Sequence, residues 1–490
     1  FCCYQYLLYL NINEFSLMTE SHTNVTTKKQ KKKERKEREN GNDTKNNQTE
    51  MVSFASIMGP TLYTRSAEHV KEMTVTNPWD FPKPTQMYST MKVFGENIVT
   101  ANDGQDHKNH RTICSPAFSS ANLEFAAHVA SEQLSNLFGL WEAAEGGDKG
   151  SFRVDPEKGL FNLTLSLIAE AGFGMQFGLA RLEEEEARKE EDKGGELSFE
   201  ESIHVVSEKL AVYVLAPSFV YHFPIPSLQK VKRAFDVFDT TIREVMSSCE
   251  KDQHKKDLIS LLVRANKQDA SKRESRQLSN DEIYGNIFMF MFAGHETTAG
   301  VLGWALRHLA ANPDAQEKAF QEVNQLLEEK GGLMITAKEV ETRLIYCKCV
   351  FFETMRRHPV VQIVPKWVEK DTSLGGVPIK QGTFVHMDIK LLHHNPRHWP
   401  NPQKFDPDRF DKRISDPINP HAFVPFSFGA RNCIGQKFAQ TTSTIALARI
   451  IHRYKISLPP GVSDEEVWQE KTMITTRCAH PLKLVFELRD

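Results

Sequence analysis

The sequence has few of the features that define several large classes of protein. Its 490 residues carry a formal net charge of -3, so no global excess of positive charge favours nucleic acid as a partner. The eight cysteines are scattered, without the dense spacing of a secreted disulfide scaffold, which favours a reducing compartment. The chain has no Gly-x-Gly-x-x-Gly fingerprint for a flavin or a nicotinamide. A hydrophobic fraction of 40% nevertheless supports a sizeable core.

The first fifty residues have little of what a folded or membrane-spanning segment needs. Residues 1–10 are aromatic and apolar, but the polar residues that follow end this run well short of the roughly 20 residues that span a bilayer. A polar tract with a basic run at residues 28–38 predicts a disordered, solvated tail, and a nucleic-acid or membrane-surface role is the alternative. The chain also begins with Phe rather than Met, which we interpret as a fragment or a misassembled gene model. We therefore expect residues 1–50 to be disordered or aberrant.

One cysteine lies in a setting that favours metal binding. Residues 426–435 read FSFGARNCIG, and the helical periodicity of residues 436–452 places Cys433 just before a helix start. Backbone N–H groups and the helix dipole at such a position make a thiol more acidic, and glycines at 429 and 435 let the backbone approach a flat cofactor. A buried structural cysteine is the alternative.

The spacing Phe-x-x-Gly-x-Arg-x-Cys-x-Gly resembles the cysteine loop of the cytochrome P-450 family of haem-thiolate monooxygenases, of the eukaryotic microsomal and fungal-like type. The resemblance implies that Cys433 is the proximal thiolate ligand of the iron of haem b. It also implies that Phe426 shields the sulfur, that Arg431 faces a haem propionate, and that Gly435 lies close to the cofactor.

The longest helix is predicted from Ser279 to Ala311. Ser279 and Glu282 have the spacing of a capping box, and Asn312 and Pro313 supply a cap and a first residue for the next helix. Its middle is apolar on all sides, so a transmembrane span is an alternative. His295 and Glu296 at its centre would be costly in lipid, and we therefore predict a helix through a protein core.

The centre of this helix carries a second motif of the same family, residues 293–298. Ala293 and Thr297 are four residues apart and share a face, and the threonine hydroxyl can donate to the carbonyl of Ala293. The resemblance implies a niche for dioxygen, in which Thr297 is the alcohol and Glu296 the acid that deliver protons. Gly294 would thin the helix there, and His295 would take no part. A simple packing groove is the alternative.

A third and a fourth motif predict a buried cluster of charges. Residues 339–357 have a helical pattern in which Glu353 and Arg356 lie one turn apart, and Pro407-Asp408-Arg409-Phe410 follows a turn-rich stretch. Alone, Glu353 and Arg356 would be an ordinary exposed pair. The resemblance implies that Arg409 completes a Glu-Arg-Arg cluster behind the haem, which we assign to stability as a structural brace.

Two further segments predict contacts with the haem propionates. Arg111 matches an arginine of the family, whereas His107, four residues earlier, stands where the family usually has a tryptophan. Lys366 stands where the family often has an arginine, and it can reach a propionate as a point charge but not bidentately. We expect Arg111 to bind a propionate, and Thr475 to lie in the wall of the substrate pocket.

The resemblance covers most of the chain and implies a mainly α fold with a small β region. We expect a single large cytochrome P-450-type helical domain at residues 51–490, in which the N-terminal strand and helix are incomplete. It would insert one atom of dioxygen into a lipophilic substrate, with electrons from NADPH through a separate flavoprotein reductase. The family also implies a cytosol-facing place on the endoplasmic reticulum membrane. A reductase-independent haem-thiolate enzyme, and a non-catalytic or truncated haem-binding protein, are the alternatives.

Overall fold

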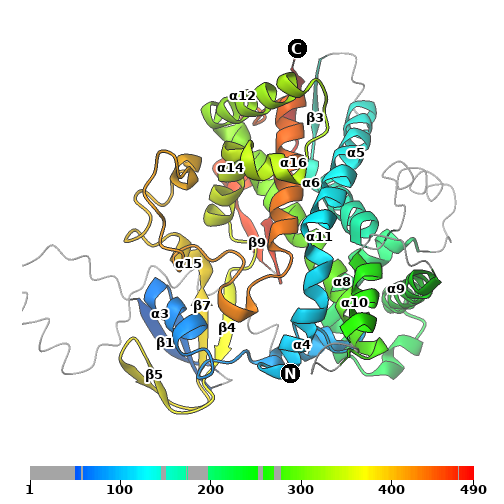
Figure 1. Cartoon of the computed structure of the whole chain (residues 1–490), viewed down its shortest axis with the longest axis vertical. Helices are drawn as coiled ribbons and strands as arrows, with labels where there is room; N and C mark the ends of the chain where they lie inside the picture. The colour runs from blue at the N-terminus through cyan, green and yellow to red at the C-terminus, as the bar shows by residue number, and fades with distance from the viewer. Residues whose placement is uncertain are drawn as a thin grey trace, which may run out of the picture. The chain divides into compact units, whose positions relative to one another are not determined.

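Helices make up most of the fold, and the strands form small sheets (Figure 1). The computed structural model describes residues 50–56, 59–144, 150–172, 174, 197–251, 258–269, 277–472 and 474–489. Residue contacts divide the chain into two compact units. Unit 1 comprises residues 1–84, 361–402 and 418–432, and unit 2 comprises residues 85–360, 403–417 and 433–490. The tail predicted at residues 1–50 lies, except for Glu50, outside the described residues.

Unit 1 is organised around a sheet in which segments far apart in the sequence are neighbours. The strand order is β1-β2-β7-β4; β2 and β7 are parallel, and the other two pairs are antiparallel. Leu62 of β2 is opposite Val385 of β7. A two-stranded sheet of β5 and β6 belongs to the same unit. The strands are β1 (Met51–Ser56), β2 (Gly59–Thr64), β4 (Ile363–Trp367), β5 (Thr372–Leu374), β6 (Val377–Ile379) and β7 (Phe384–Asp388).

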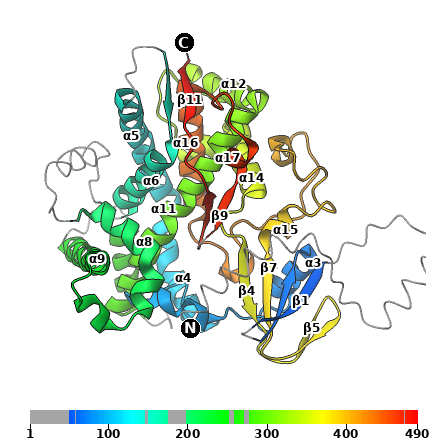
Figure 2. The ribbon, with the colours of Figure 1, turned by 180° about the vertical axis from the view of Figure 1, so that it is seen from behind.

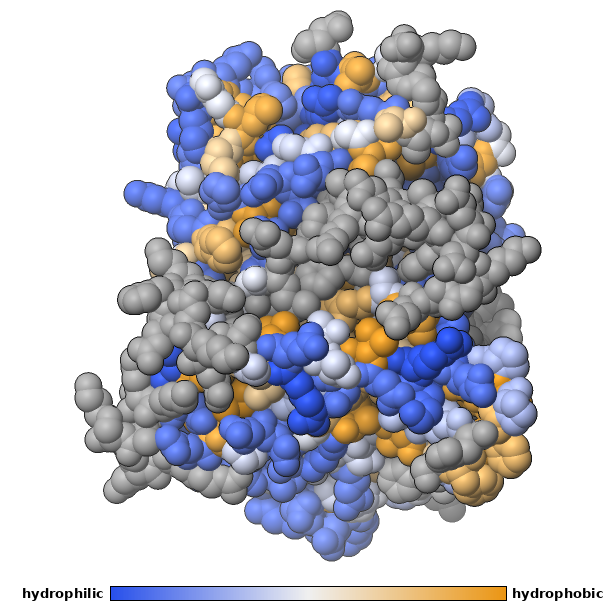
Figure 3. All heavy atoms as spheres, turned by 90° about the vertical axis from the view of Figure 1, so that its right-hand side faces the viewer, coloured by the Kyte–Doolittle hydropathy of each residue, from blue (hydrophilic) through white to orange (hydrophobic). Residues whose placement is uncertain are grey.

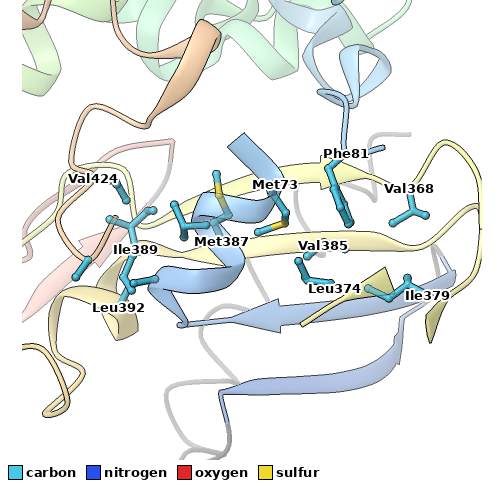
Figure 4. Packing of buried hydrophobic residues seen from close by; sticks show 13 residues of the cluster. Met73, Phe81, Val368, Leu374, Ile379, Val385, Met387, Ile389, Leu392 and Val424 are labelled. Carbon is cyan, nitrogen blue, oxygen red and sulfur yellow. The ribbon is translucent and has the colours of Figure 1, made fainter. Parts of the chain in front are cut away.

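The core of unit 1 lies on one face of this sheet. Val385 and Met387 of β7 belong to a buried cluster that also contains Met73 and Phe81 (Figure 4). The short helix α3 (Ala67–Lys71) is capped by Ser66, whose hydroxyl accepts a hydrogen bond from the N–H of His69. Among its described residues, the unit also contains the short helical segments η1 (Glu72–Thr76), α15 (Ile389–His393) and η7 (Gly429–Arg431).

Unit 2 is organised around α11 (Asn280–Ala311), which contacts α6, α14 and α16 (Figures 1 and 2). Residues 282–292 and 301–310 of this helix are all buried, as expected of a helix through a core. The longer helices of the unit are α4 (Gln105–Cys114), α5 (Ser120–Ala144), α6 (Pro156–Leu167), α8 (Phe199–Leu215), α9 (Pro226–Lys251), α10 (Leu258–Asp269), α12 (Pro313–Lys330), α14 (Ile345–Arg357) and α16 (Gln436–Arg453). The shorter segments are η2 (Thr85–Lys92), η3 (Ser115–Phe118), η4 (Ile168–Gly172), η5 (Ser218–His222), α13 (Ala337–Thr342), η6 (Pro407–Phe410) and α17 (Asp464–Trp468).

The predicted start and end of α11 are confirmed. The N–H of Glu282 donates to the Ser279 hydroxyl at 3.1 Å, and the Glu282 carboxylate accepts the N–H of Ser279 at 2.7 Å. Asn312 follows the helix as predicted, but its side chain donates back to the carbonyl of His308 at 2.8 Å and does not cap α12. The helix α12 instead begins at Pro313, whose fixed φ matches the helical conformation.

The single helix predicted at residues 339–357 is wrong. The structure has two helices there, α13 and α14. The break is stabilised from outside the segment, because the carboxylate of Glu322 in α12 accepts the N–H groups of Tyr346 and Cys347 at 2.7 and 3.0 Å. These are the free N–H groups at the start of α14, and an acid elsewhere in the chain satisfies them.

Unit 2 also contains two small antiparallel sheets, with strand orders β3-β11-β8 and β10-β9 (Figure 2). Their strands are β3 (Ser151–Val154), β8 (Tyr454–Ser457), β9 (Glu470–Thr472), β10 (Thr476–Cys478) and β11 (Leu484–Leu488). Figure 3 shows one face of the molecule, on which apolar residues are scattered among hydrophilic ones. Among the described residues, none of the helices is both long and apolar enough to cross a bilayer.

Candidate active site

Cys433 lies where the sequence places it, two residues before the N-terminal cap position of α16. Its thiol is exposed, whereas the described cysteines at 114, 347, 349 and 478 are buried. Desolvation by the surrounding protein raises the pKa of the Cys433 thiol, and the Gly435 N–H and the charge of Arg111 oppose that rise. The predicted acidifying groups are therefore present, but they do not outweigh desolvation. A coordinated metal ion deprotonates a thiol outright. The Gly435 N–H and the charge of Arg111 would then stabilise the thiolate as a metal ligand.

Gly435 lies close to the Cys433 sulfur and to an aromatic ring. A β-carbon added to Gly435 would lie 3.8 Å from the Cys433 sulfur and 3.9 Å from the ring of Phe118. The Phe118 ring in turn meets Phe290 of α11 edge to face, with 5.4 Å between the ring centroids. The proximity of Phe118 to the cysteine loop could not be predicted, because the two segments are more than three hundred positions apart in the sequence.

The first half of the cysteine loop belongs to unit 1. Gly429 has φ of 75°, and a β-carbon there would overlap the carbonyl oxygen of Thr74, so only glycine fits. Ser427 also has a positive φ, of 61°. Phe426 and Arg431 are half-buried in this unit. The cysteine loop therefore belongs to unit 1 up to Asn432 and to unit 2 from Cys433 onwards.

The central turn of α11 is accessible although the turns on both sides of it are buried. Ala293 is exposed and Thr297 is half-buried, whereas residues 286–292 and 301–310 are buried. The Thr297 hydroxyl donates to the Ala293 carbonyl at 2.7 Å, as the spacing predicts. A core helix with one accessible turn, bearing an alcohol beside the carboxylate of Glu296, is suited to handling protons next to a bound group.

The neighbours of this turn explain two other residues of the motif. Gly294 lets another side chain pack closely, since a β-carbon there would lie 2.7 Å from Ile168 Cδ1. His295 points towards α6, where its ring meets Phe161 edge to face at 4.8 Å and its carbonyl accepts the Thr164 hydroxyl at 3.0 Å. Burial lowers the pKa of His295, so this imidazole is neutral at pH 7.

Glu296 has a partner that the sequence did not predict. The Thr475 hydroxyl donates to Oε1 of Glu296 at 2.6 Å. Thr475 was expected only in the wall of the pocket, because two residues 179 positions apart show no spacing signal in a single sequence.

Glu353, Arg356 and Arg409 lie together in unit 2. Arg356 donates two hydrogen bonds of 2.7 Å to the Glu353 carboxylate, and both side chains are fully buried. Arg409 Nε lies 3.7 Å from Glu353 Oε1, which also accepts the Asp406 N–H at 2.9 Å. Burial raises the pKa of Glu353, and the hydrogen bonds from Arg356 lower it. The cluster joins α14 to η6.

The residues considered for the propionates lie on three elements, α4, β4 and η7, the last of which carries Arg431. Arg111 and His107 are both in α4, half-buried and buried respectively, and desolvation lowers the pKa of Arg111 while the nearby Cys433 raises it. Lys366 is buried in β4 of unit 1. Each is thus on a regular element, and Arg111 is electrostatically coupled to Cys433.

Comparison with known structures identifies the fold as that of a cytochrome P450 haem domain. The crystal structure of the cytochrome P450DA heme domain matches with a TM-score of 0.75 and 23% identity, and the match covers 90% of each chain. This confirms the predicted fold class, mainly α with a small β region.

Comparison of sequences extends this from fold to family. A model of the Cytochrome P450 family matches residues 20–483. Cytochrome P450 monooxygenase 124 of Postia placenta is 32% identical over 432 residues, which cover 83% of this chain and 78% of that protein. Cytochrome P450 3A41 of Mus musculus is 28% identical over 400 residues, which cover 81% of this chain and 76% of that protein. The chain belongs to the cytochrome P450 family, and it is a haem-thiolate monooxygenase.

Proposed function

We propose that the chain binds haem b through Cys433 and hydroxylates a lipophilic substrate with electrons from NADPH, delivered by a separate flavoprotein reductase. The observation that carries the proposal is the exposed thiol of Cys433 at the start of α16, beside the Gly435 N–H and the charge of Arg111. Arg111 and Arg431 would hold the propionates, and Phe426 would shield the sulfur. We propose residues 51–490 as the catalytic domain.

When bound, haem iron with a thiolate ligand supplies the activation of dioxygen. The chain's own residues then have three tasks. Cys433 would hold the iron through its sulfur, which accepts a hydrogen bond from the Gly435 N–H. The accessible face at Ala293 leaves room beside the helix, and Thr297 and Glu296 carry protons there from solvent. Glu353, Arg356 and Arg409 brace the fold and take no part in the chemistry.

Membrane association is part of the same proposal. The segment after α8 exposes large apolar side chains: Phe219, Phe223 and Ile225 are 61%, 50% and 47% exposed. Apolar side chains exposed close together suit contact with a lipid surface, as on the endoplasmic reticulum. Cosedimentation with phospholipid vesicles tests this, and the double variant Phe219→Ser, Phe223→Ser should reduce binding.

The carbon monoxide difference spectrum of the reduced protein tests the proposed ligand. The purified protein should show the band of a thiolate-bound haem, and Cys433→Ala should lose it. Cys349→Ala is the matched control, because Cys349 is a buried cysteine of the same unit and should leave the band unchanged. Retention of the band in Cys433→Ala would move the ligand elsewhere.

Turnover tests the remainder of the proposal. With NADPH, reductase and a panel of lipophilic compounds under ¹⁸O₂, product should carry one labelled oxygen atom, and Thr297→Val should lower product formation about a hundredfold. Product formed equally well from peroxide without reductase would favour a reductase-independent enzyme. Unchanged turnover in Thr297→Val would remove Thr297 from the proton path.

A further inference from the structure

The carboxylate of Glu296 is held by a part of the chain outside its own helix. Thr475 lies just before β10, and its hydroxyl donates to Glu296 Oε1 at 2.6 Å. The Thr475 side chain is nearly buried, at 7% exposure, whereas Glu296 is half-buried. The bond therefore joins a fixed donor to a carboxylate that still has access to solvent.

The backbone around Thr475 is fixed by several independent contacts. The N–H of Thr476 donates to the carbonyl of Val360 at 2.8 Å, and Thr476 is paired with Thr472 in the β10–β9 ladder. The same segment packs on α11, because a β-carbon added to Gly300 would lie 3.5 Å from the Thr476 carbonyl oxygen. Gly300 is one turn beyond Glu296. The position of the Thr475 hydroxyl is therefore set by the backbone of the hairpin.

A free glutamate on this turn would occupy many positions. Its side chain has three rotatable bonds, and confining such a side chain to one orientation costs rotamer entropy. A hydroxyl has a single donor hydrogen, so Thr475 engages Oε1 and leaves Oε2 for other partners. The neighbouring Thr297 hydroxyl donates to Ala293, so both groups of the turn have defined orientations.

We propose that Thr475 is a positioning residue for proton delivery: its hydroxyl holds the Glu296 carboxylate in the orientation from which that group passes protons towards Thr297. The proposal rests on the proposed function of Glu296. A proton that leaves Glu296 is replaced from solvent. The carboxylate must therefore be reachable from solvent and also lie towards Thr297. Without the Thr475 hydroxyl, Glu296 can still carry a proton, but its carboxylate is no longer held in one orientation. Proton transfer towards Thr297 is therefore slower.

Infrared spectroscopy tests the contact itself, independently of turnover. The carboxylate band that disappears in Glu296→Gln should shift in Thr475→Val and should be unchanged in Thr475→Ser, which keeps the hydroxyl. Thr476→Val is the matched control, since its hydroxyl contacts Thr472 at 3.1 Å and lies in the same hairpin. A band at the same position in Thr475→Val and in the parent protein would overturn the proposal.

The kinetic test needs neither a substrate nor a reductase. Dithionite-reduced, haem-loaded protein is mixed with oxygenated buffer, and the rate of return to the ferric spectrum is followed between pH 6 and 8 in H₂O and D₂O. Glu296→Gln should change this rate and its solvent isotope effect, and Thr475→Val should move both in the same direction by about threefold or more. Thr475→Ser and Thr476→Val should match the parent.

The outcomes separate this inference from the proposal on which it rests. If Glu296→Gln leaves the rate and the isotope effect unchanged, Glu296 does not deliver protons, and both proposals are wrong. If Glu296→Gln changes them and Thr475→Val does not, only the role of Thr475 is wrong. The carbon monoxide spectrum of each variant shows whether it has folded around its haem.

Discussion

Glu353 and Arg356 are both fully buried one helical turn apart, and each neutralises a charge that the core would otherwise hold alone. Glu353→Gln should lower the free energy of unfolding of the haem-loaded protein by about 3–5 kcal/mol, because Arg356 keeps its charge and loses its ionic partner. Urea unfolding followed by the haem absorbance measures this loss.

Two further variants distinguish the cost of an unpaired buried charge from the cost of losing an ion-pair contact. The double variant Glu353→Gln, Arg356→Leu should be more stable than the single variant, because it leaves no unpaired charge in the core. The exposed pair of Lys232 and Asp236 is the control, and Asp236→Asn should cost less than about 1 kcal/mol. Equal costs at the buried and the exposed pair would contradict this explanation.

At the scale of residues, what could be predicted followed from spacing along the chain. Ala293 and Thr297 are four apart on a helix, so their hydrogen bond was foreseeable, and so was the pairing of Glu353 with Arg356. The partner of Glu296 was not foreseeable, because Thr475 is distant in sequence and comes from another element. The sequence predicted a more acidic thiol at Cys433, whereas the protein raises its pKa. Desolvation causes this rise, and it depends on the whole surrounding protein.

At the scale of elements, α11 and the loop before α4 approach each other so closely that a glycine is needed on each side. A β-carbon on Gly285 would lie 2.5 Å from the carbonyl oxygen of Gly95, and Gly95 itself has φ of 121°. Asn286 adds a side-chain bond, because its Oδ1 accepts the N–H of Ile98 at 2.8 Å. The loop around Gly95 is therefore held against the helix by backbone contact.

Gly285→Ala should destabilise the protein although it replaces a glycine in a helix. Such a replacement ordinarily stabilises a helix by up to about 1 kcal/mol. Here the overlap with two backbone carbonyl groups should outweigh that gain and lower the free energy of unfolding by about 1–3 kcal/mol. Urea unfolding of the haem-loaded variant measures the change.

Gly303→Ala on the same helix is the matched control. The nearest atom to its added β-carbon is Glu157 Cγ at 3.9 Å, an ordinary contact, so this variant should be as stable as the parent or more so. If both variants were stabilised, the close approach of the loop at Gly95 would not exist in solution.

Element boundaries were predictable where the capping residues belong to the element itself. Ser279 and Glu282 begin α11 with their own side chains, so its start could be read from four residues. The start of α14 could not, because its cap is the carboxylate of Glu322 in α12. A cap from another helix has no fixed spacing in the sequence.

At the scale of the whole molecule, acid stability should depend on a buried histidine outside the active site. His308 is stacked on Phe405, with 4.3 Å between the ring centroids, and it lies 4.6 Å from Trp468. Burial lowers the pKa of His308 well below 6.5, and the nearby His358, Arg357 and Arg356 lower it further. The folded protein therefore excludes a proton that the unfolded chain binds.

The sign of the pH effect follows from this difference. Above pH 6.5 neither state protonates His308, and the histidine has no effect on the pH dependence. As the pH falls below 6.5, only the unfolded chain takes up the proton, so stability falls by up to about 1.4 kcal/mol per pH unit. In His308→Phe, the loss of stability between pH 6.5 and pH 5 should be smaller by up to about 2 kcal/mol.

A comparison of variants isolates this contribution from other titrating groups. In unit 1, burial lowers the pKa of His386 to about 4 and raises that of Asp388 to about 6, and both effects cancel between parent and variant. An identical acid profile in His308→Phe and the parent would contradict the assignment.

The fold class could be predicted because several local motifs occur in the order of one family. The assembly of the sheets could not. Parallel β2 and β7 bring Leu62 beside Val385, and no periodicity in either strand specifies a partner so distant in the sequence. Nor did the sequence indicate that the cysteine loop is divided between two compact units after Asn432.

The bond between Thr475 and Glu296 also has a consequence for the order of events during synthesis. Ribosomes add about 5–20 residues per second, so Thr475 is made roughly 10–40 s after Glu296, which precedes it by 179 residues. Throughout that interval, α11 can already exist as a helix while its acid has no fixed orientation. The proton pathway would therefore be among the last parts of the nascent enzyme to mature, after the helices that surround it.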